Sequence, residues 1–425
     1  MTIVKRDSFV NDAGVYLFSN ILNAIIPFIL LPILTRYLSP AEYGEVAMFQ
    51  TLVGALVAFV GITFVGSAGR KYYDHNVSQS QLAEFIGSCI QLIFIFSLAV
   101  MTLFFIFQSK IAQWTGIKAE YVLWAVVFSS ATVIITIRLD QWQVRKQAIK
   151  YGVMQISQSL FNMLLSLLLV VVLLKGADGR INAQIAMSLV FVIIALFLLK
   201  KDNLFKLFIW KKEYLVEALK FGVPLIPHIA GGFLLTTVDR FVINREIGIA
   251  EAGIYMVAVQ LTAAIGIVFD AINKAYIPWL FEKLAINNLK DKQNIVKFTY
   301  VWFLLIIVGV ILSFFIGPLL VVFIAGEQYE QAGKVIGWLA LGQGFQGMYL
   351  IVTNYIFYSK RTGLLSVSSI GSGILNLILL IILVRIFGLE GAAIAFAISM
   401  GIRFLLTWWI AHKRHPMPWF SFIVK

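Results

Sequence analysis

Polar side chains recur at helical spacing inside long apolar segments of this 425-residue sequence. Residues three or four positions apart share one face of a helix, and four segments have such a polar face. These faces consist of Asn20, Asn23 and Pro27; Gln155, Gln158 and Asn162; Gln343, Gln346 and Asn354; and Ser369, Ser372 and Asn376. Amides can hydrogen-bond the hydroxyl groups of a sugar, directly or through water, and they can equally join neighbouring helices. Both interpretations stay open for each face.

Basic side chains at or inside apolar segments are the second chemical feature. Arg70 and Lys71 follow one segment, Lys274 follows another, and Arg403 lies inside the last. A guanidinium fork matches the oxygens of a phosphate, and a lysine supplies a point charge. Arg70, Lys71 and Lys274 can also simply extend to the membrane surface, whereas the deeper position of Arg403 favours a binding role.

One segment combines helix-breaking and titratable residues, namely Pro224, Pro227, His228, Asp239 and Arg240. Proline removes a backbone donor, so a bent helix that could act as a gate is expected here. His228 and Asp239 could carry protons, although a hydrogen-bonded buried histidine is the more common case. Arg240 is adjacent to Asp239 and can pair with it.

The elements that position these residues must lie in a membrane. Hydrophobic residues make up 60% of the chain and charged residues 13%, whereas soluble domains have about 45–50% and about 25%. A spanning helix needs about 20 apolar residues, and twelve such segments are present. They are Val15–Leu34, Val46–Ala68, Phe85–Phe107, Tyr121–Ile137, Val153–Leu174, Ile181–Leu199, Gly222–Ile243, Gly253–Ala271, Tyr300–Ile324, Val335–Phe357, Leu364–Val384 and Ala392–Ala411.

The net charge of +13 is distributed unevenly over the loops. With twelve spans, one side of the membrane holds 24 basic residues and the other side holds eight. Cytoplasmic loops carry the excess of Lys and Arg, so both termini are predicted in the cytoplasm. The charge is therefore a topology signal, and nucleic acid is not an expected partner. The sequence shows no signal peptide.

The two halves of the chain repeat. The segment from Arg36 to Gly44 aligns with Arg245 to Gly253 at an offset of 209, and Gly176 to Gly179 aligns with Gly388 to Gly391 at 212. Six spans per half give both halves the same orientation, an architecture typical of transporters. The predicted fold is an all-α integral membrane protein with two parallel six-helix bundles, 1–199 and 222–425. A cytoplasmic interfacial helix over 200–221 is predicted to link them.

Motifs for other chemistry are missing from the sequence. No phosphate-binding loop, Cys/His cluster or Gly-x-Ser-x-Gly elbow is present, so ATP hydrolysis and hydrolase chemistry lack their usual residues. The loops are too short for a separate catalytic domain. We therefore expect a protein that is not an enzyme and that needs no cofactor or metal.

Two regions of the sequence resemble a known family. The run from Leu34 to Gly44, and the run from Phe221 to His228 followed by Asp239, Arg240 and Phe241, are similar to O-antigen and polysaccharide repeat-unit flippases. These belong to the exporter superfamily of multidrug, oligosaccharidyl-lipid and polysaccharide transporters, whose fold is MATE-like.

The resemblance implies transport of an undecaprenyl-pyrophosphate-linked oligosaccharide across the bacterial inner membrane, from the inner to the outer leaflet. Arg70, Lys71, Lys274 and Arg403 are then candidates for the diphosphate, and the amide residues for the glycan path. Coupling to H+ or Na+ is left open. A polysaccharide polymerase and a chain-length regulator are further candidate partners.

Three other functions compete with this interpretation. A cation-coupled multidrug exporter of the same fold would gain from carboxylates in its spans, but Asp239 is the only clear one, against Arg240 and Arg403. A membrane glycosyltransferase or polymerase normally needs long outer loops or a carboxylate site. A purely structural scaffold would not need two duplicated bundles.

Overall fold

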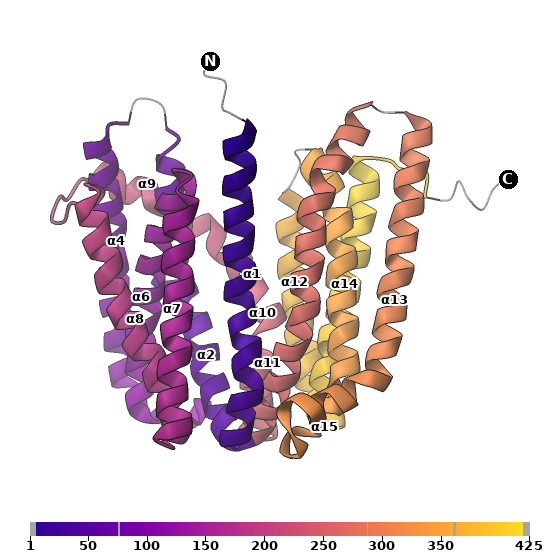
Figure 1. Cartoon of the computed structure of the whole chain (residues 1–425), viewed down its shortest axis with the longest axis horizontal. Helices are drawn as coiled ribbons and strands as arrows, with labels where there is room; N and C mark the ends of the chain where they lie inside the picture. Colours follow the sequence, from indigo (N-terminus) through magenta and orange to yellow (C-terminus); the bar gives the residue numbers. More distant parts are fainter. Residues whose placement is uncertain (1–5, 75–76, 287, 360–362, 420–425) are drawn as a thin grey trace. The chain divides into compact units, whose positions relative to one another are not determined.

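The computed structural model describes residues 6–74, 77–286, 288–359 and 363–419, and every regular element within these ranges is a helix (Figure 1). The chain divides into two compact units, Met1–Ala230 and Gly231–Lys425. The all-α prediction is therefore confirmed for the described residues. The predicted domain limits, with a second bundle that begins at residue 222, stay a prediction.

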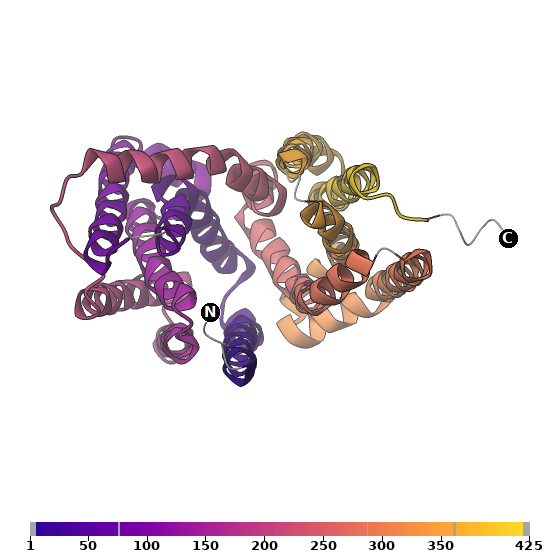
Figure 2. The ribbon, with the colours of Figure 1, turned by 90° about the horizontal axis from the view of Figure 1, so that it is seen from above.

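Unit 1 contains nine complete α-helices and a short π-helical turn, followed by η2 and the first residues of α10. They are α1 (Arg6–Tyr37), α2 (Pro40–Val60), α3 (Ile62–Lys71), α4 (Gln79–Ile106), α5 (Gln108–Thr115), α6 (Ala119–Val144), α7 (Ala148–Leu167), η1 (Leu168–Val172), α8 (Gly176–Lys201) and α9 (Lys212–Gly222). Figure 2 shows α9 lengthwise, while the long helices of this unit are seen nearly end-on.

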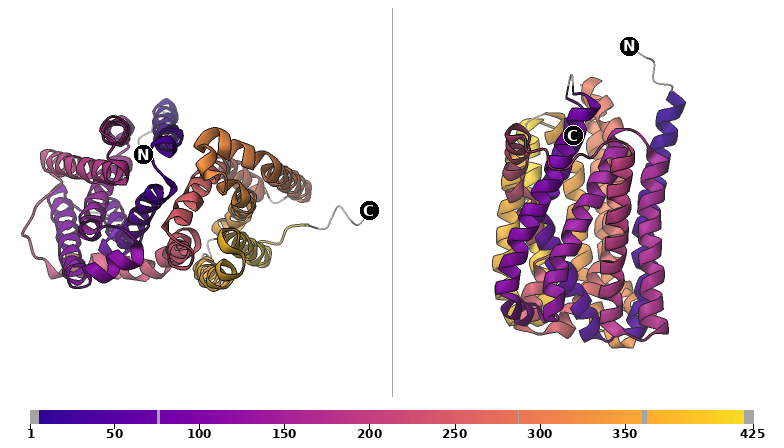
Figure 3. Two further views of the ribbon diagram at one scale, coloured as in Figure 1. Left: turned by 90° about the horizontal axis from the view of Figure 1, so that it is seen from below. Right: turned by 90° about the vertical axis from the view of Figure 1, so that its left-hand side faces the viewer.

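The remaining helices lead into unit 2 and build it; the views in Figure 3 show them from below and from one side. They are η2 (Val223–Leu225), α10 (Ile226–Thr236), α11 (Asp239–Glu246), α12 (Ile249–Ile286), α13 (Leu289–Ala325), η3 (Glu327–Tyr329), α14 (Ala332–Tyr358) and α15 (Gly363–Arg414).

Ten helical stretches among the described residues are long and apolar enough to cross a membrane, so this is a multi-pass membrane protein. Two of the twelve predicted spans are missing from these ten as separate helices. α2 and α3 are separated at Gly61, and the last two predicted spans are joined in α15, which has a non-helical residue at Gly388. The count of twelve and the side of the termini stay predictions.

Local sequence signals explain several helix ends. Ser39 and Glu42 form a reciprocal capping box at the start of α2, and Ser78 and Gln81 form another at the start of α4. Such boxes satisfy backbone N–H groups that have no partner in the first helical turn. Gly61 has φ 143°, a backbone conformation that favours glycine, and the helix is interrupted there.

The repeated Gly-acidic-Gly segments also share a backbone feature. Gly176 has φ 56° and Gly388 has φ 58°, at positions related by the offset of 212. Each glycine is therefore in the left-handed region, which is costly for other residues. The structure thus shows a positive φ of nearly the same size at equivalent positions of the two halves.

Several charged segments that the sequence assigned to loops are helical. α12 extends to Ile286 and α13 begins at Leu289, so most of the predicted loop around Lys274–Lys297 is helix. Conversely, the predicted linker is not one helix: α8 ends at Lys201 and α9 begins at Lys212. Residues Asp202–Lys211 are irregular, with positive φ at Asn203 and Phe208, and the predicted interfacial helix is correspondingly shorter.

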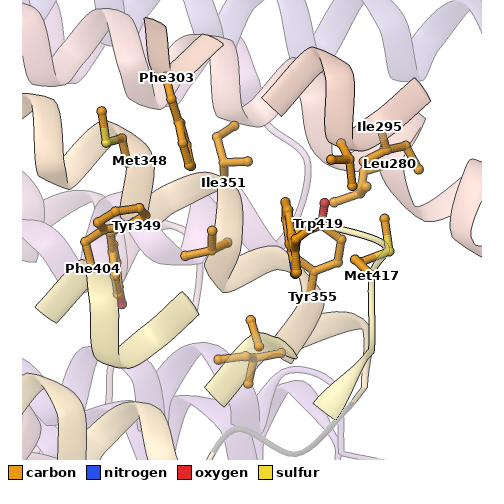
Figure 4. Packing of buried hydrophobic residues seen from close by; sticks show 14 of the residues in the cluster. Leu280, Ile295, Phe303, Met348, Tyr349, Ile351, Tyr355, Phe404, Met417 and Trp419 are labelled. Atoms are coloured by element: carbon orange, nitrogen blue, oxygen red, sulfur yellow. The ribbon is translucent and has the colours of Figure 1, made fainter. Parts of the chain in front are cut away.

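Each unit has its own hydrophobic core. In unit 1, Phe85, Ile86 and Ile90 of α4 pack with Ile134 and Ile137 of α6. In unit 2, the core joins α12, α13, α14, α15 and the C-terminal segment, and Figure 4 shows Phe303, Tyr349, Tyr355, Phe404 and Trp419 within it. Since each unit buries its own core, the polar side chains of that unit are held by well-packed helices.

Candidate functional site

A cavity of about 630 Å³ lies within unit 1 between the end of α3 and α9. Its charged lining residues are Arg70 and Lys71 from α3, and Glu213, Glu217 and Lys220 from α9. Phe221, Pro224 and Leu225 contribute an apolar wall. Charged groups beside an apolar wall can hold an anionic head group next to a lipid tail.

Arg70 and Lys71 have different surroundings, although they are adjacent. Lys71 Nζ donates to both carboxylate oxygens of Glu217 at 2.8 and 2.9 Å, and it lies 3.2 Å from Asp74. Burial acts to lower the pKa of Lys71, but the hydrogen bonds with Glu217 and Asp74 outweigh it, so the pKa is raised. Lys71 therefore joins α9 to α3.

Arg70 is exposed, and its guanidinium carbon lies 5.6 Å from the centre of the Phe221 ring. It forms no ion pair with a carboxylate of the described residues. Its fork is therefore available to a phosphate. Lys220, which the sequence interpretation did not select, is exposed in the same cavity.

A second cavity, of about 240 Å³, lies among α1, α6, α7 and α8 of unit 1. It brings together four predicted glycan-path residues, Asn23, Gln155, Gln158 and Asn162. The structure adds further polar lining residues that sequence reasoning missed: Thr132, Thr136, Ser159, Gln184 and Ser188. Asn20 lies close to α7 and accepts a 3.4 Å hydrogen bond from the Tyr151 hydroxyl.

Hydrogen bonds hold part of this amide wall. Ser159 donates to Asn23, and Arg180 Nη1 donates to Asn162 at 3.2 Å and to the Ser166 hydroxyl at 2.5 Å. Arg180 is 9% exposed in α8, although its charge suggests a loop position. A hydropathy pattern cannot reveal a charge that is buried against side-chain oxygens.

A third polar group is centred on Arg403 in unit 2. Arg403 donates to Gln346 Oε1 and to the Ser369 hydroxyl, both at 3.2 Å, and its guanidinium lies 4.0 Å from the centre of the Tyr349 ring. These residues come from α14 and from both arms of α15. The predicted positions of Arg403, Gln346 and Ser369 are therefore combined in one network.

Other predicted path residues join helices instead. Asn354 donates to Asn273 of α12 at 2.8 Å, and both side chains are buried. Asn376 donates to the backbone oxygen of Leu234 at 2.9 Å. Gln343 lies against Gly266: a Cβ added to Gly266 would lie 2.8 Å from the Oε1 atom of Gln343. For Asn354 and Asn376 the observed contacts match the interpretation that amides hold helices together.

Lys274, Asp239 and Arg240 do not line these cavities. Lys274 pairs with Asp270 at 2.6 Å on the exposed face of α12. Asp239 and Arg240 are buried and lie 3.3 Å apart. Around Pro224 and Pro227 the short 3-10 turn η2 lies between α9 and α10, and the predicted bend and its role as a gate stay predictions. The side chain of His228 lies outside the described part of the structure.

Comparisons with known proteins identify the family. Residues 9–284 match the family model described as "Polysaccharide biosynthesis protein". The chain is 26% identical over 373 residues to an uncharacterized membrane protein of Haemophilus influenzae. The aligned region covers 87% of this chain and 89% of that protein. It is 20% identical over 417 residues to a putative O-antigen transporter of Shigella flexneri, with 95% and 97% covered.

Solved structures share the fold at low sequence identity. An inward-facing MATE family multidrug resistance transporter of the MOP superfamily gives a TM-score of 0.73 at 14% identity, covering 92% of this chain and 94% of that one. The lipid II flippase MurJ in an inward closed conformation gives 0.72 at 16%, covering 94% and 87%. The predicted resemblance is confirmed, and since the family model spans more than half of the sequence, this multi-pass membrane protein belongs to the polysaccharide biosynthesis protein family.

Proposed function

We propose that this protein is a flippase that moves an undecaprenyl-pyrophosphate-linked oligosaccharide from the inner to the outer leaflet of the bacterial inner membrane. The match of residues 9–284 to the polysaccharide biosynthesis family carries the proposal. The names of two similar proteins, a putative O-antigen transporter and a lipid II flippase, support the same class of cargo. No bond is made or broken, so the protein is not an enzyme.

Two units with separate cores supply the parts that alternating access requires. The cargo has an anionic diphosphate, a polar glycan and a long lipid. In this proposal the diphosphate binds cationic side chains, the glycan follows amide-lined cavities, and the lipid stays in the bilayer. H+ or Na+ would drive the cycle, and a polymerase and a chain-length regulator would receive the product.

The environments of the charged residues favour an anionic cargo over the organic cations of a multidrug exporter. Arg70 and Arg403 form no ion pair with the described carboxylates. Asp239 is already paired with Arg240, and Asp270, near the end of another predicted span, is paired with Lys274, so each of these carboxylates already has a cationic partner. Arg70, Lys220 and Arg403 are thus the cations best placed for the diphosphate, and Lys71 and Lys274 contribute less.

Reconstitution tests the proposal directly. Purified protein in liposomes is assayed for movement of a labelled lipid-diphosphate oligosaccharide, with and without imposed proton or sodium gradients. We expect protein-dependent movement of the lipid, accelerated by one of the two gradients. Transport of cationic drugs without movement of the lipid would overturn the proposal and support the multidrug exporter.

Alanine variants of Arg70, Lys274 and Arg403, and the triple variant, test the diphosphate assignment. Lys334→Ala removes a basic residue on the predicted opposite side and is the matched control. We expect a strong loss for Arg70 and Arg403, a weak one for Lys274, and none for Lys334. Normal movement by the well-folded triple variant would refute the assignment of these cations.

A further inference from the structure

We infer that the cavity among α1, α6, α7 and α8 is a binding subsite for one sugar ring, which donates hydroxyl hydrogens to Gln155 and Gln184. The inference rests on the proposed function, because it assigns a part of the cargo to a place within unit 1. The cavity encloses about 240 Å³. This is somewhat smaller than the roughly 300–1,000 Å³ typical of sites for drug-sized ligands, and it suits a single ring.

Two acceptors in the wall lack partners. Gln155 Oε1 and Gln184 Oε1 are buried and accept no hydrogen bond from the described residues, and Gln184 as a whole is 8% exposed. A buried carbonyl oxygen without a donor loses its hydrogen bonds to water and gains none in return, which is unfavourable. Because the terminal torsion of glutamine is broad, each oxygen can turn toward the cavity that its side chain lines.

The rest of the lining matches a polyhydroxylated ligand. Thr132, Thr136 and Ser188 offer hydroxyl groups that can donate or accept, and Gln158 offers an amide with both functions. Phe128, Ile135, Leu139 and Met187 give apolar patches that can cover the C–H face of a ring. A cavity with both kinds of surface fixes the orientation of its ligand.

Charge then limits the type of sugar. None of the described residues that line the cavity is acidic, which disfavours a cation. Arg180 lies directly behind the wall, bonded to Asn162, and forms no ion pair with the described carboxylates. A positive charge in a low-dielectric setting attracts anions and repels ammonium groups. The subsite therefore accepts neutral and carboxylated rings and rejects free amino sugars.

Leucine substitutions separate binding from folding. Gln155→Leu, Gln184→Leu and the double variant remove the acceptors while they keep the side-chain bulk. Each substitution removes a buried acceptor that has no donor, and with it the desolvation cost of that oxygen, so thermal stability should not fall. Gln91→Leu is the matched control, since Gln91 is a buried glutamine of α4 with an unpaired amide and does not line this cavity.

Binding is measured by saturation-transfer NMR on purified protein in nanodiscs, with glucose, glucuronate and glucosamine as probes. The wild type and Gln91→Leu should bind glucuronate and glucose more strongly than glucosamine, and the double variant should lose at least about tenfold in affinity. Arg180→Gln keeps donors for Asn162 and Ser166 but removes the positive charge. It should therefore abolish the preference for glucuronate over glucosamine. Equal binding by the double variant and the wild type, or no binding by the wild type, would overturn the inference.

The same variants in the liposome assay distinguish this inference from the proposed function. If the wild type moves the lipid-linked glycan and the double variant moves and binds sugar equally well, the subsite is wrong while the flippase proposal stands. If the wild type moves no lipid, the flippase proposal is wrong. The binding measurement uses no lipid-linked substrate, so it decides about the subsite in either case.

Discussion

Neighbouring cations in this protein have different tasks. Arg70 and Lys71 are adjacent in sequence and line the same cavity, yet Lys71 is paired with Glu217 and Asp74, whereas Arg70 contacts an aromatic ring. A paired lysine holds two helices together, and an unpaired arginine can bind an anion. Two basic residues of one motif can thus be separated into a structural and a ligand-binding residue.

Arg70→Ala should therefore lower translocation, whereas Lys71→Ala should lower stability. Arg70→Ala removes no ion pair, so stability is retained, and loss of a charge-assisted bond to the diphosphate lowers translocation about tenfold or more. Lys71→Ala leaves Glu217, itself 43% exposed, without its partner, which costs about 0.5–1 kcal/mol after screening by solvent. Thermal unfolding and the liposome assay measure both quantities. Equal loss of stability in the two variants would contradict this separation.

Arg403 tests the importance of geometry as distinct from charge. Its fork reaches Gln346 and Ser369 and its plane covers Tyr349, and a lysine cannot reproduce all three contacts. Arg403→Lys should fall between the wild type and Arg403→Ala in translocation, and Arg403→Ala should cost about 1–3 kcal/mol in stability because polar partners remain unpaired. Indistinguishable translocation by Arg403→Lys and the wild type would show that charge alone suffices.

The sequence predicts only part of the candidate site. Helical spacing places Gln155, Gln158 and Asn162 on one face, and the structure shows that face lining a cavity. Spacing within one helix carries no information about what other helices contribute, so Gln184, Thr132 and Lys220 were missed. It also cannot distinguish a cavity amide from Asn354, whose amide is bonded to Asn273.

At the scale of elements, the break in α15 depends on one backbone conformation. Gly388 has φ 58° and ψ −135°, and no atom lies within 4 Å of a Cβ added there. Gly388→Ala should therefore destabilise by backbone strain alone, by about 1–3 kcal/mol, seen as a lower melting temperature. Gly371→Ala, also unobstructed but without a positive φ, is the control and should be neutral or stabilising. A melting temperature unchanged by Gly388→Ala would contradict the assignment of strain.

The C-terminal segment should loosen at acidic pH. The His415 ring stacks on Tyr355, and its buried Nε2 has no partner among the described residues. Burial, and secondarily Lys292, lowers the pKa of His415 below its usual 6.5. The folded protein therefore favours the neutral ring. This contribution to stability is complete above the unfolded pKa and is lost as the pH falls through the lower folded pKa.

Hydrogen exchange of residues 411–419 measures this effect. Protection in the wild type should be lower at pH 5 than at pH 7.5, and His415→Phe should remove the difference because it keeps an aromatic ring without a titratable nitrogen. His412, which is exposed on the preceding turn, provides the control variant His412→Gln. An equal pH response in His415→Phe would assign the effect to another group.

Helix positions were more predictable than helix ends. The length of an apolar segment is fixed by the bilayer, and this locates the helices. Charged residues such as Lys283 and Lys292 continue the helices beyond that length, because helix formation outside the bilayer depends on capping and packing. The irregular segment before Lys212 has positive φ at Asn203 and Phe208; asparagine adopts such a φ readily, whereas phenylalanine gives no indication of it.

At the scale of the whole molecule, helix length constrains how often the chain crosses the bilayer. α15 has 52 residues, which at 1.5 Å per residue would extend about 78 Å if straight, against a hydrocarbon core of about 30 Å. The break at Gly388 divides it into two arms of nearly equal length, each long enough to span. We therefore predict that the chain turns back near Gly388, so that each arm crosses the membrane once.

Single cysteines can test this topology, because Cys89 is the only native cysteine and is buried. In a Cys89→Ser background, a membrane-impermeant thiol reagent applied outside cells should label Glu390→Cys and Glu327→Cys. It should label Asn203→Cys and Lys413→Cys only after the membrane is opened, since the excess of basic residues marks the cytoplasmic side. Labelling of Glu390→Cys and Lys413→Cys from the same side would show that the second arm of α15 does not cross, and the two halves could then not both have six spans.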